Sequence, residues 1–312
     1  MKKVLAVIYF TFSLSLICTA ETSLELLPFS SLRNSCTTED LFFSGTFGTD
    51  SSKICSELLW NEKFAISTGL DSLFTLANKK SSFIFRNGIS VSLPYNKGKM
   101  TDTDWNSALI KSDYSEFNNN IVYAFETWTG FCWQIIFNSF KAGPLAEAKY
   151  SEISFNAKNI FGWTDLDSKT PHYYPDGKKH LADINYKSKK AAFFTGIYAE
   201  KNFMKKLTVS LSGKISPFTF VFVQDRHTKR NYTFEDYVYS CFSNYELTSS
   251  LSYKITGRMS AYISFLFNYF YLTKCDEYYN WDESSRDTLS SQKAGYSYYS
   301  YEITAGVKIK VF

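Results

Sequence analysis

The 312-residue sequence contains few histidines and few cysteines, and this scarcity excludes several classes of protein. Its three histidines, His172, His180 and His227, do not form a metal-binding pattern such as HExxH, and no two cysteines have the CxxC spacing. A zinc site is therefore not expected. Five cysteines lie beyond residue 20 at wide intervals, which excludes a small disulfide-stabilised scaffold. Because five is an odd number, at least one thiol must stay unpaired.

The sequence also lacks a charge imbalance and long apolar runs. The 34 Lys and Arg residues nearly balance the 30 Asp and Glu residues, so nothing favours a nucleic acid partner. Beyond residue 20, no stretch approaches twenty uninterrupted apolar residues, which excludes a membrane protein built from helices. No linker rich in Pro, Gly or Ser divides the chain. We therefore expect a single domain over residues 21–312.

The first twenty residues have the three parts of an export signal. Lys2 and Lys3 precede an apolar run over residues 4–17, and small residues follow at 18–20. The alternative is a membrane-anchor helix, but hydroxyl residues interrupt the apolar run, which is also short for a membrane span. Residues 1–20 are thus predicted to be a signal peptide.

Aromatic residues, by contrast, are abundant. The chain has 29 Phe and 23 Tyr beside 21% charged residues, a mixture that suits a membrane β-barrel with aromatic girdles, a lipid-facing surface and a polar interior. Within residues 259–272, apolar side chains such as Ile263 and Phe265 alternate with polar ones such as Ser264. Residues 301–311 alternate in the same way and end at Phe312, like the terminal strands of bacterial outer-membrane barrels. A soluble β-sandwich could also end on such a strand.

This alternation predicts an all-β fold, a ten-stranded antiparallel transmembrane β-barrel that extends beyond the outer membrane. The expected strands cover residues 38–49, 53–78, 81–96, 118–129, 131–154, 177–201, 205–224, 232–256, 258–277 and 294–312. Tight joins at residues 78–80, 129–130, 201–202 and 256–258 all follow even-numbered strands. If both termini are periplasmic, residues 97–117, 155–176, 225–231 and 278–293 are external loops.

Two segments of these predicted loops carry chemistry. Asp102 and Asp104 follow the third strand at a spacing of two, so in an extended segment both carboxylates can point the same way and hold a shared proton or a water. Asp225 and His227 close the seventh strand at the same spacing, and a carboxylate beside an imidazole orients the ring and improves it as a proton acceptor. Each motif alone is more simply read as ordinary turn residues in solvent.

The two motifs could face one another across the external mouth, because the third and seventh strands lie nearly opposite each other in a ten-stranded barrel. His227 would then take a proton from a water held between the two sides, and no serine or cysteine nucleophile is needed. This arrangement suits hydrolysis of an amide at the external mouth.

The motifs resemble those of the omptin family of outer-membrane proteases, ten-stranded barrels that pair an M-x-D-x-D-W segment with a D-x-H segment. Here they read Met100 to Trp105 and Asp225 to His227. The resemblance implies that Asp225 and His227 activate the water and that Asp102 and Asp104 face them. It also implies a requirement for lipopolysaccharide, with no other cofactor, although no segment matches the family's basic lipid-binding cluster.

The sequence departs from the family at a position that affects specificity. Omptins that cut beside basic residues carry an acidic residue two positions before the Asp of D-x-H, and this chain has Val223 there. The first external loop, around residues 50–52, looks shortened. The preference for dibasic sites is therefore in doubt, although the hydrolytic group is intact.

One feature of the seventh strand conflicts with this reading. Leu207, Val209 and Leu211 read as lipid-facing, and strict alternation would put Asp225 and His227 on the same outer face. An irregularity must intervene, and a bulge at Pro217 or strong strand twist would supply it.

Three functions fit a barrel of this kind. The first is an outer-membrane endopeptidase that acts on extracellular polypeptides as a monomer, surrounded by outer-membrane lipid. The second is a non-proteolytic binding barrel such as an adhesin. The third is a small pore, which is disfavoured because ten strands enclose little space and inward residues such as Lys214 and Glu246 are expected to fill it with ion pairs.

Overall fold

The computed structural model describes residues 21–43, 53–106, 108–164, 169–173, 183–228, 232–281 and 285–312. The predicted signal peptide and the predicted short loop at residues 50–52 lie outside these ranges. No helix in the described ranges is long and apolar enough to cross a membrane. The strands are β1 (Glu21–Phe42), β2 (Ile54–Ala77), β3 (Ser81–Ser92), β4 (Tyr95–Trp105), β5 (Lys111–Phe137), β6 (Phe140–Thr164), β7 (Thr170–Tyr173), β8 (Asp183–Asn202), β9 (Leu207–His227), β10 (Tyr232–Ser240), β11 (Asn244–Lys254), β12 (Met259–Trp281) and β13 (Ser285–Lys310).

The strands form one closed antiparallel barrel, which confirms the predicted fold class. β13 pairs with β1, and pairing continues around the sheet until β5 and β6 close it. The structure has thirteen described strands rather than the predicted ten. β3 and β4 follow one another between β2 and β5, β10 and β11 follow one another between β9 and β12, and β7 is a short addition to β6. Ten positions around the barrel therefore remain.

Each interruption has a local cause. β3 and β4 are separated at Leu93-Pro94, where proline has no N–H for the ladder. β10 and β11 are separated at residues 241–243, where Phe242 has a φ of 58°, a left-handed conformation outside the β region that interrupts the regular ladder.

The predicted turn at Thr129-Gly130 is wrong. β5 continues through Gly130, and the turn lies at Asn138-Ser139, where Asn138 has a φ of 52°. Gly130 serves packing instead, since a Cβ on it would lie 2.6 Å from the carbonyl oxygen of Ala146 on β6. The glycine lets two strands approach closely and does not reverse the chain.

The predicted external loops are also largely wrong, because the strands continue well beyond the apolar part of the barrel. Most of residues 97–117 belongs to β4 and β5, and β6 runs to Thr164. β1 likewise begins at Glu21 and not near residue 38. Outside lipid a strand has no need of an apolar outer face, so the alternation that marks a membrane strand fades there.

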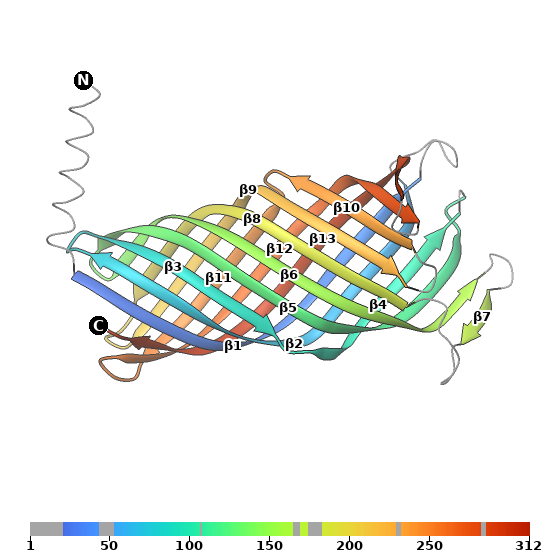
Figure 1. Ribbon diagram of the computed structural model, residues 1–312. Helices are drawn as coiled ribbons and strands as arrows, with labels where there is room; N and C mark the ends of the chain where they lie inside the picture. Colours follow the sequence, from blue (N-terminus) through green and yellow to red (C-terminus); the bar gives the residue numbers. More distant parts are fainter. Residues whose placement is uncertain are drawn as a thin grey trace, which may run out of the picture.

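The outer surface carries the predicted apolar band. Ile263, Phe265 and Tyr271 on β12 and Tyr301 and Ile303 on β13 are all exposed. The chain end at Phe312 and the turns after β2, β5, β8 and β11 lie at one end of the barrel, here called the turn end (Figure 1). The opposite end, here called the mouth end, holds Asp104 and His227.

β9 contains the irregularity that its sequence requires. Toward the turn end its odd-numbered side chains face outward, as exposed Leu211 does, whereas beyond residues 216–217 exposed Phe218 faces outward. Asp225 and His227 therefore face the barrel interior and are buried.

The pairing of β9 with β8 locates this bulge. Ile215 pairs with Thr195 and Phe218 pairs with Phe193, so β9 has one more residue than β8 between these two pairs. The Ser216 hydroxyl lies 2.8 Å from the Phe193 carbonyl oxygen and 2.7 Å from that of Phe218, which ties the bulge to both strands. Such a one-residue insertion reverses the faces of all later side chains.

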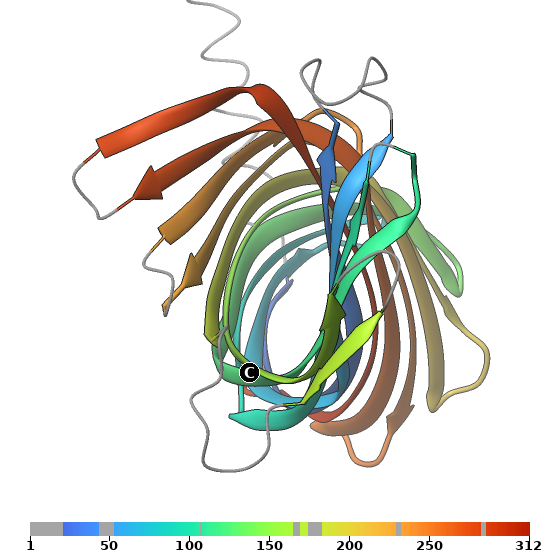
Figure 2. The same cartoon turned by 90° about the vertical axis from the view of Figure 1, so that its right-hand side faces the viewer.

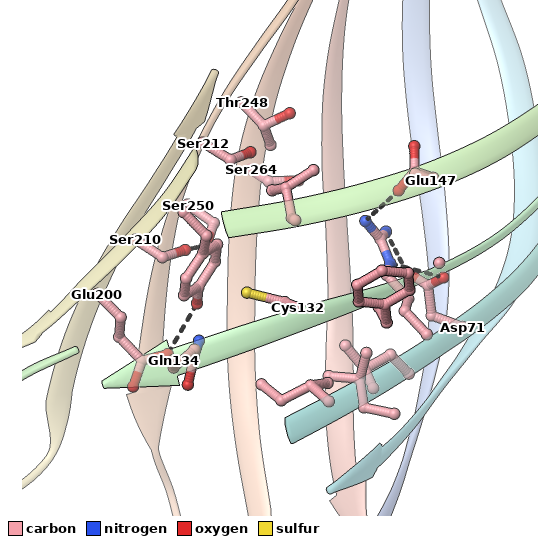
Figure 3. Close-up of a pocket in the computed structure, with 18 of the residues that line it drawn as sticks. Asp71, Cys132, Gln134, Glu147, Glu200, Ser210, Ser212, Thr248, Ser250 and Ser264 are labelled. Atoms are coloured by element: carbon pink, nitrogen blue, oxygen red, sulfur yellow. Dashed lines mark hydrogen bonds and ion pairs between the residues drawn. The ribbon is translucent and has the colours of Figure 1, made fainter. Parts of the chain in front are cut away.

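Ion pairs cross the interior of the apolar section, as predicted for Lys214 and Glu246. Lys214 Nζ lies 2.6 Å from Glu147 and 2.5 Å from Glu246, and Lys149 Nζ lies 2.8 Å from Glu246. Toward the turn end the lumen contains a cavity of about 220 Å³ rich in hydroxyl side chains, with Asp71, Gln134, Glu147 and Glu200 among the residues around it (Figure 3).

An aromatic plug separates this lumen from the mouth end. The rings of Trp60, Tyr186 and Phe155 pack on one another, and all three side chains are almost completely buried. The ring centroid of Trp60 lies 4.3 Å from that of Tyr186 and 5.8 Å from that of Phe155, and those of Phe155 and Tyr186 are 5.7 Å apart. Met100 and Phe117 are buried in the same apolar cluster. Several large side chains are thus buried at one level of the barrel, between the lumen cavity and the mouth end.

Candidate active site

The last inward positions of β9 hold Asp225 and His227. The two side chains form a pair, with Asp225 Oδ2 3.3 Å from His227 Nε2, and both are buried. In the β9–β10 register, Asp225 lies opposite Phe234 and His227 opposite Tyr232. The Tyr232 and His227 rings pack with centroids 4.5 Å apart, so the imidazole contacts both a carboxylate and an aromatic ring.

Asp102 and Asp104 lie on β4, not on a loop. They pair with Leu58 and Ser56 of β2 and are spaced by two, so both side chains project from the same face of the strand. Both line the same cavity as Asp225 and His227. The spacing argument from the sequence thus holds, although the segment is regular strand.

All four predicted site residues meet at one cavity of about 370 Å³, here called the mouth cavity. β1, β2 and β4 supply one wall of the cavity, and β9, β10 and β12 supply the other. Figure 2 looks onto this end of the barrel. The lining residues are Glu39, Leu41, Cys55, Ser56, Leu58, Asp102, Asp104, Trp105, Val223, Asp225, His227, Tyr232, Phe234, Asp236 and Glu277.

Two polar atoms at the cavity wall can each form a further hydrogen bond. Asp225 Oδ1 and His227 Nδ1 are buried and accept or donate no hydrogen bond among the described residues. A buried polar atom without a partner is costly unless water or substrate satisfies it. No group of three or more His, Cys, Asp or Glu side chains in the described ranges is arranged to hold a metal ion.

Comparison with known proteins identifies the family. The family model described as "Omptin family" matches residues 47–311, which is most of the chain. The chain belongs to the omptin family of outer-membrane proteases. It is therefore a bacterial outer-membrane protein, as the two motifs predicted. No curated protein matches the chain.

The crystal structure of an outer-membrane protease supports the fold of this omptin. The crystal structure of the outer membrane protease OmpT from Escherichia coli matches with a TM-score of 0.80 and 17% identity, over 92% of this chain and 96% of that one. Two other barrels match with much lower scores. The translocator domain of the autotransporter NalP from Neisseria meningitidis has a TM-score of 0.36 and 7% identity, with 99% of this chain and 97% of that one covered. The outer membrane protein OprG from Pseudomonas aeruginosa has a TM-score of 0.33 and 8% identity, with 94% and 97% covered.

The mouth cavity of this omptin contains three acidic residues that sequence reasoning missed, Glu39, Asp236 and Glu277. Burial raises the pKa of Asp236 to about 7 and that of Glu277 to about 9, and the negative charges of neighbouring carboxylates, Asp225 among them, add to both shifts. Burial and the charges of Asp236 and Asp225 raise the pKa of Glu39 as well. Continuing the β9–β10 hairpin from His227 would have placed Asp236 beside the site, but the required loop length is not evident from the sequence.

Val223, two positions before Asp225, is almost completely buried and lines the mouth cavity. Cys55 lines the cavity too, and its thiol is unpaired, as are those of Cys36, Cys132, Cys241 and Cys275. At least one unpaired thiol was expected from the odd number.

Proposed function

We propose that this omptin is an endopeptidase that hydrolyses extracellular polypeptides with a water molecule activated by Asp225 and His227 and held opposite Asp102 and Asp104. The observation that carries the proposal is the convergence of these four side chains on one cavity from strands on opposite sides of the barrel end. The 3.3 Å contact between Asp225 and His227 supports their role as a pair.

The chemistry needs no covalent intermediate. His227 accepts a proton from the water as its oxygen bonds to the carbonyl carbon of the scissile amide, and the carbonyl π electrons move to oxygen. The imidazolium beside Asp225 then gives that proton to the amide nitrogen, the C–N bond breaks, and an acid and an amine leave. Asp102 and Asp104 position the water and the substrate from the facing wall.

The alternative functions have less support. A pore is disfavoured by the aromatic plug of Trp60, Tyr186 and Phe155 and by the ion pairs in the lumen. A non-proteolytic binding barrel would not require four catalytic side chains at one cavity. If the well-folded protein cleaves no peptide, the binding barrel becomes the favoured function.

The test is digestion of a mixed peptide library by the refolded full-length barrel. His227→Ala and Asp102→Ala should each abolish the cuts that the wild type makes. Glu235→Gln is the matched control, because Glu235 lies on β10 beside the site and pairs through its side chain with Gln224, away from the cavity. Cuts that survive in both site variants, or no cuts by a well-folded wild type, would contradict the proposal.

We also propose that lipopolysaccharide supports this activity and that the protein acts as a monomer, since one chain supplies the whole site. Lys187 and Lys189 alternate along β8 with buried residues and lie four to six positions from exposed Phe193 in the apolar band. Lys187 ion-pairs with Glu152 at 2.8 Å, and the Tyr123 hydroxyl donates to the same carboxylate at 2.6 Å.

Cations near the edge of an apolar band suit the phosphate groups of an outer-membrane lipid. Adding lipopolysaccharide to the refolded barrel should raise its cleavage rate, and the Lys187→Ala/Lys189→Ala variant should respond less. Equal activity with and without lipopolysaccharide would remove the lipid from the proposal.

A further inference from the structure

The imidazole of His227 is flanked by a large side chain on each adjoining strand. Tyr232 of β10 and Ile184 of β8 lie directly opposite His227 in the register, and directly opposite side chains share a face of the sheet. The planes of the Tyr232 and His227 rings meet at 33°, and the Phe234 ring lies edge-on to the imidazole, at 80° and with centroids 5.7 Å apart. The Tyr232 and Phe234 rings also pack on each other, with centroids 5.2 Å apart. Two aromatic rings that support each other therefore both contact the imidazole.

The orientation of this imidazole decides which of its nitrogens can accept a proton. Asp225 Oδ2 lies 3.3 Å from Nε2, while Nδ1 is buried without a hydrogen-bond partner among the described residues. One nitrogen of a neutral imidazole carries a proton and the other accepts one, and a carboxylate can only accept. The proton of neutral His227 is therefore expected on Nε2, and Nδ1 is left as the acceptor. A half-turn of the ring about the Cβ–Cγ bond would move Nε2 away from Asp225 and lose this assignment.

We infer that Tyr232 and Phe234 form an aromatic clamp, which holds the His227 imidazole in the orientation that keeps Nε2 on Asp225 and leaves Nδ1 for the water. This inference rests on the proposed protease function, and it makes Tyr232 and Phe234 positioning residues that act through His227. A single contact to Asp225 still allows the ring to rotate about that contact. Packing on Tyr232, with Phe234 at the edge, supplies the second constraint that fixes a planar group.

The places of the two aromatic residues favour this role over core packing. Both line the mouth cavity and are half-buried, and the cluster of buried apolar residues around Trp60 contains neither. Replacing Tyr232 should therefore disturb the site more than it disturbs the barrel. Heat-modifiable migration in gels shows whether each variant below is a folded barrel.

Steady-state kinetics on a peptide that the wild type cleaves test the clamp. Tyr232→Leu removes the ring but keeps a large apolar side chain. We expect its kcat to fall about ten- to a hundredfold, since displacing a catalytic group by about 1 Å costs that much, and its KM to stay within about twofold of wild type. Tyr232→Phe keeps the ring and should keep kcat within about threefold.

The matched control is Tyr237→Leu, the same change on the same strand. Tyr237 packs on Phe222, with ring centroids 5.1 Å apart, and Phe222 lies between the inward-facing Val221 and Val223 of β9 and so faces outward. Tyr237→Leu should therefore keep the kcat of the wild type.

Nitrogen NMR of the refolded full-length barrel, labelled at histidine, tests the clamp without any cleavage. The chain has three histidines, so the His227 signals are those missing from the spectrum of His227→Ala. In the neutral ring, a nitrogen that carries a proton and one that does not have well-separated shifts. We expect the wild type and Tyr232→Phe to show one tautomer, with the proton on Nε2, and Tyr232→Leu to show a mixture of both.

Two results would overturn the inference. One is a Tyr232→Leu variant that keeps the wild-type tautomer or a kcat within about threefold of wild type. The other is a Tyr232→Phe variant that loses as much activity as Tyr232→Leu, because the hydroxyl and not the ring would then be the group required. A well-folded wild type that cleaves no peptide contradicts the protease proposal separately, and the NMR spectra still decide whether the clamp orients the ring.

Discussion

At the scale of single residues, the proposed chemistry depends on how His227 is held. Asp225 contacts one ring nitrogen and Tyr232 packs on the ring, while Nδ1 remains available for a further partner. Asp225→Asn keeps the shape of the side chain but removes the charge that orients the imidazole. We expect kcat to fall by about a thousandfold or more with little change in KM. Steady-state kinetics on a peptide identified by the library screen would measure both, and a kcat within about tenfold of wild type would contradict this role.

The single residue Glu277 makes the free energy of unfolding depend on pH. Burial, with the charges of Asp236 and Asp225, raises its pKa from 4.5 to about 9. Between these two pH values the folded chain holds a proton on Glu277 that the unfolded chain has lost, so the free energy of unfolding falls as pH rises through this window. Glu277→Gln cannot lose a proton and should flatten the decline.

Urea unfolding in detergent micelles at a series of pH values would measure this change. The matched control is again Glu235→Gln, which should keep the wild-type slope. A Glu277→Gln variant that loses stability between pH 5 and pH 9 as steeply as the wild type, both pH values lying within that window, would contradict the assignment.

At the scale of strands, the bulge at residues 216–217 decides whether the site exists. It turns Asp225 and His227 inward although the membrane part of β9 has the opposite phase. Deleting Pro217 should restore strict alternation, direct both side chains outward and abolish cleavage, whereas Pro217→Ala keeps the residue count and should stay active. Cleavage assays on both folded variants distinguish them, and an active deletion variant would show that the bulge is dispensable.

The strands also indicate how far the sequence alone could lead. The lipid-facing alternation on β12 and β13 was readable because lipid imposes it, and the spacing within each motif placed Asp102 with Asp104 and Asp225 with His227. Beyond the apolar band the outer face of a strand meets water and not lipid, so the continuation of β4 and β5 was not readable. Glu39, Asp236 and Glu277 were missed because only pairing between strands brings them to one cavity.

At the scale of the whole molecule, ion pairs across the lumen connect strands that are distant in sequence. Lys214 on β9 contacts Glu147 on β6 and Glu246 on β11, and all three are buried. Lys214→Met would leave these carboxylates with less positive charge and should lower the free energy of unfolding by about 3–5 kcal/mol. Lys205→Met, at an exposed position in the turn after β8, should change it by no more than about 0.5 kcal/mol. Urea titrations in micelles measure both, and equal effects would mean that the network adds no stability.

The aromatic plug formed by Trp60, Tyr186 and Phe155 lies at the inner end of the mouth cavity, so the cavity opens only at the mouth end. A polypeptide cannot pass through the barrel, so it must enter the mouth cavity from outside and leave by the same opening. In the proposed reaction, both fragments, the water and every exchanged proton use that single opening. The enzyme should therefore favour exposed, bendable stretches of its targets, and a cleaved fragment that lingers would block the next turnover.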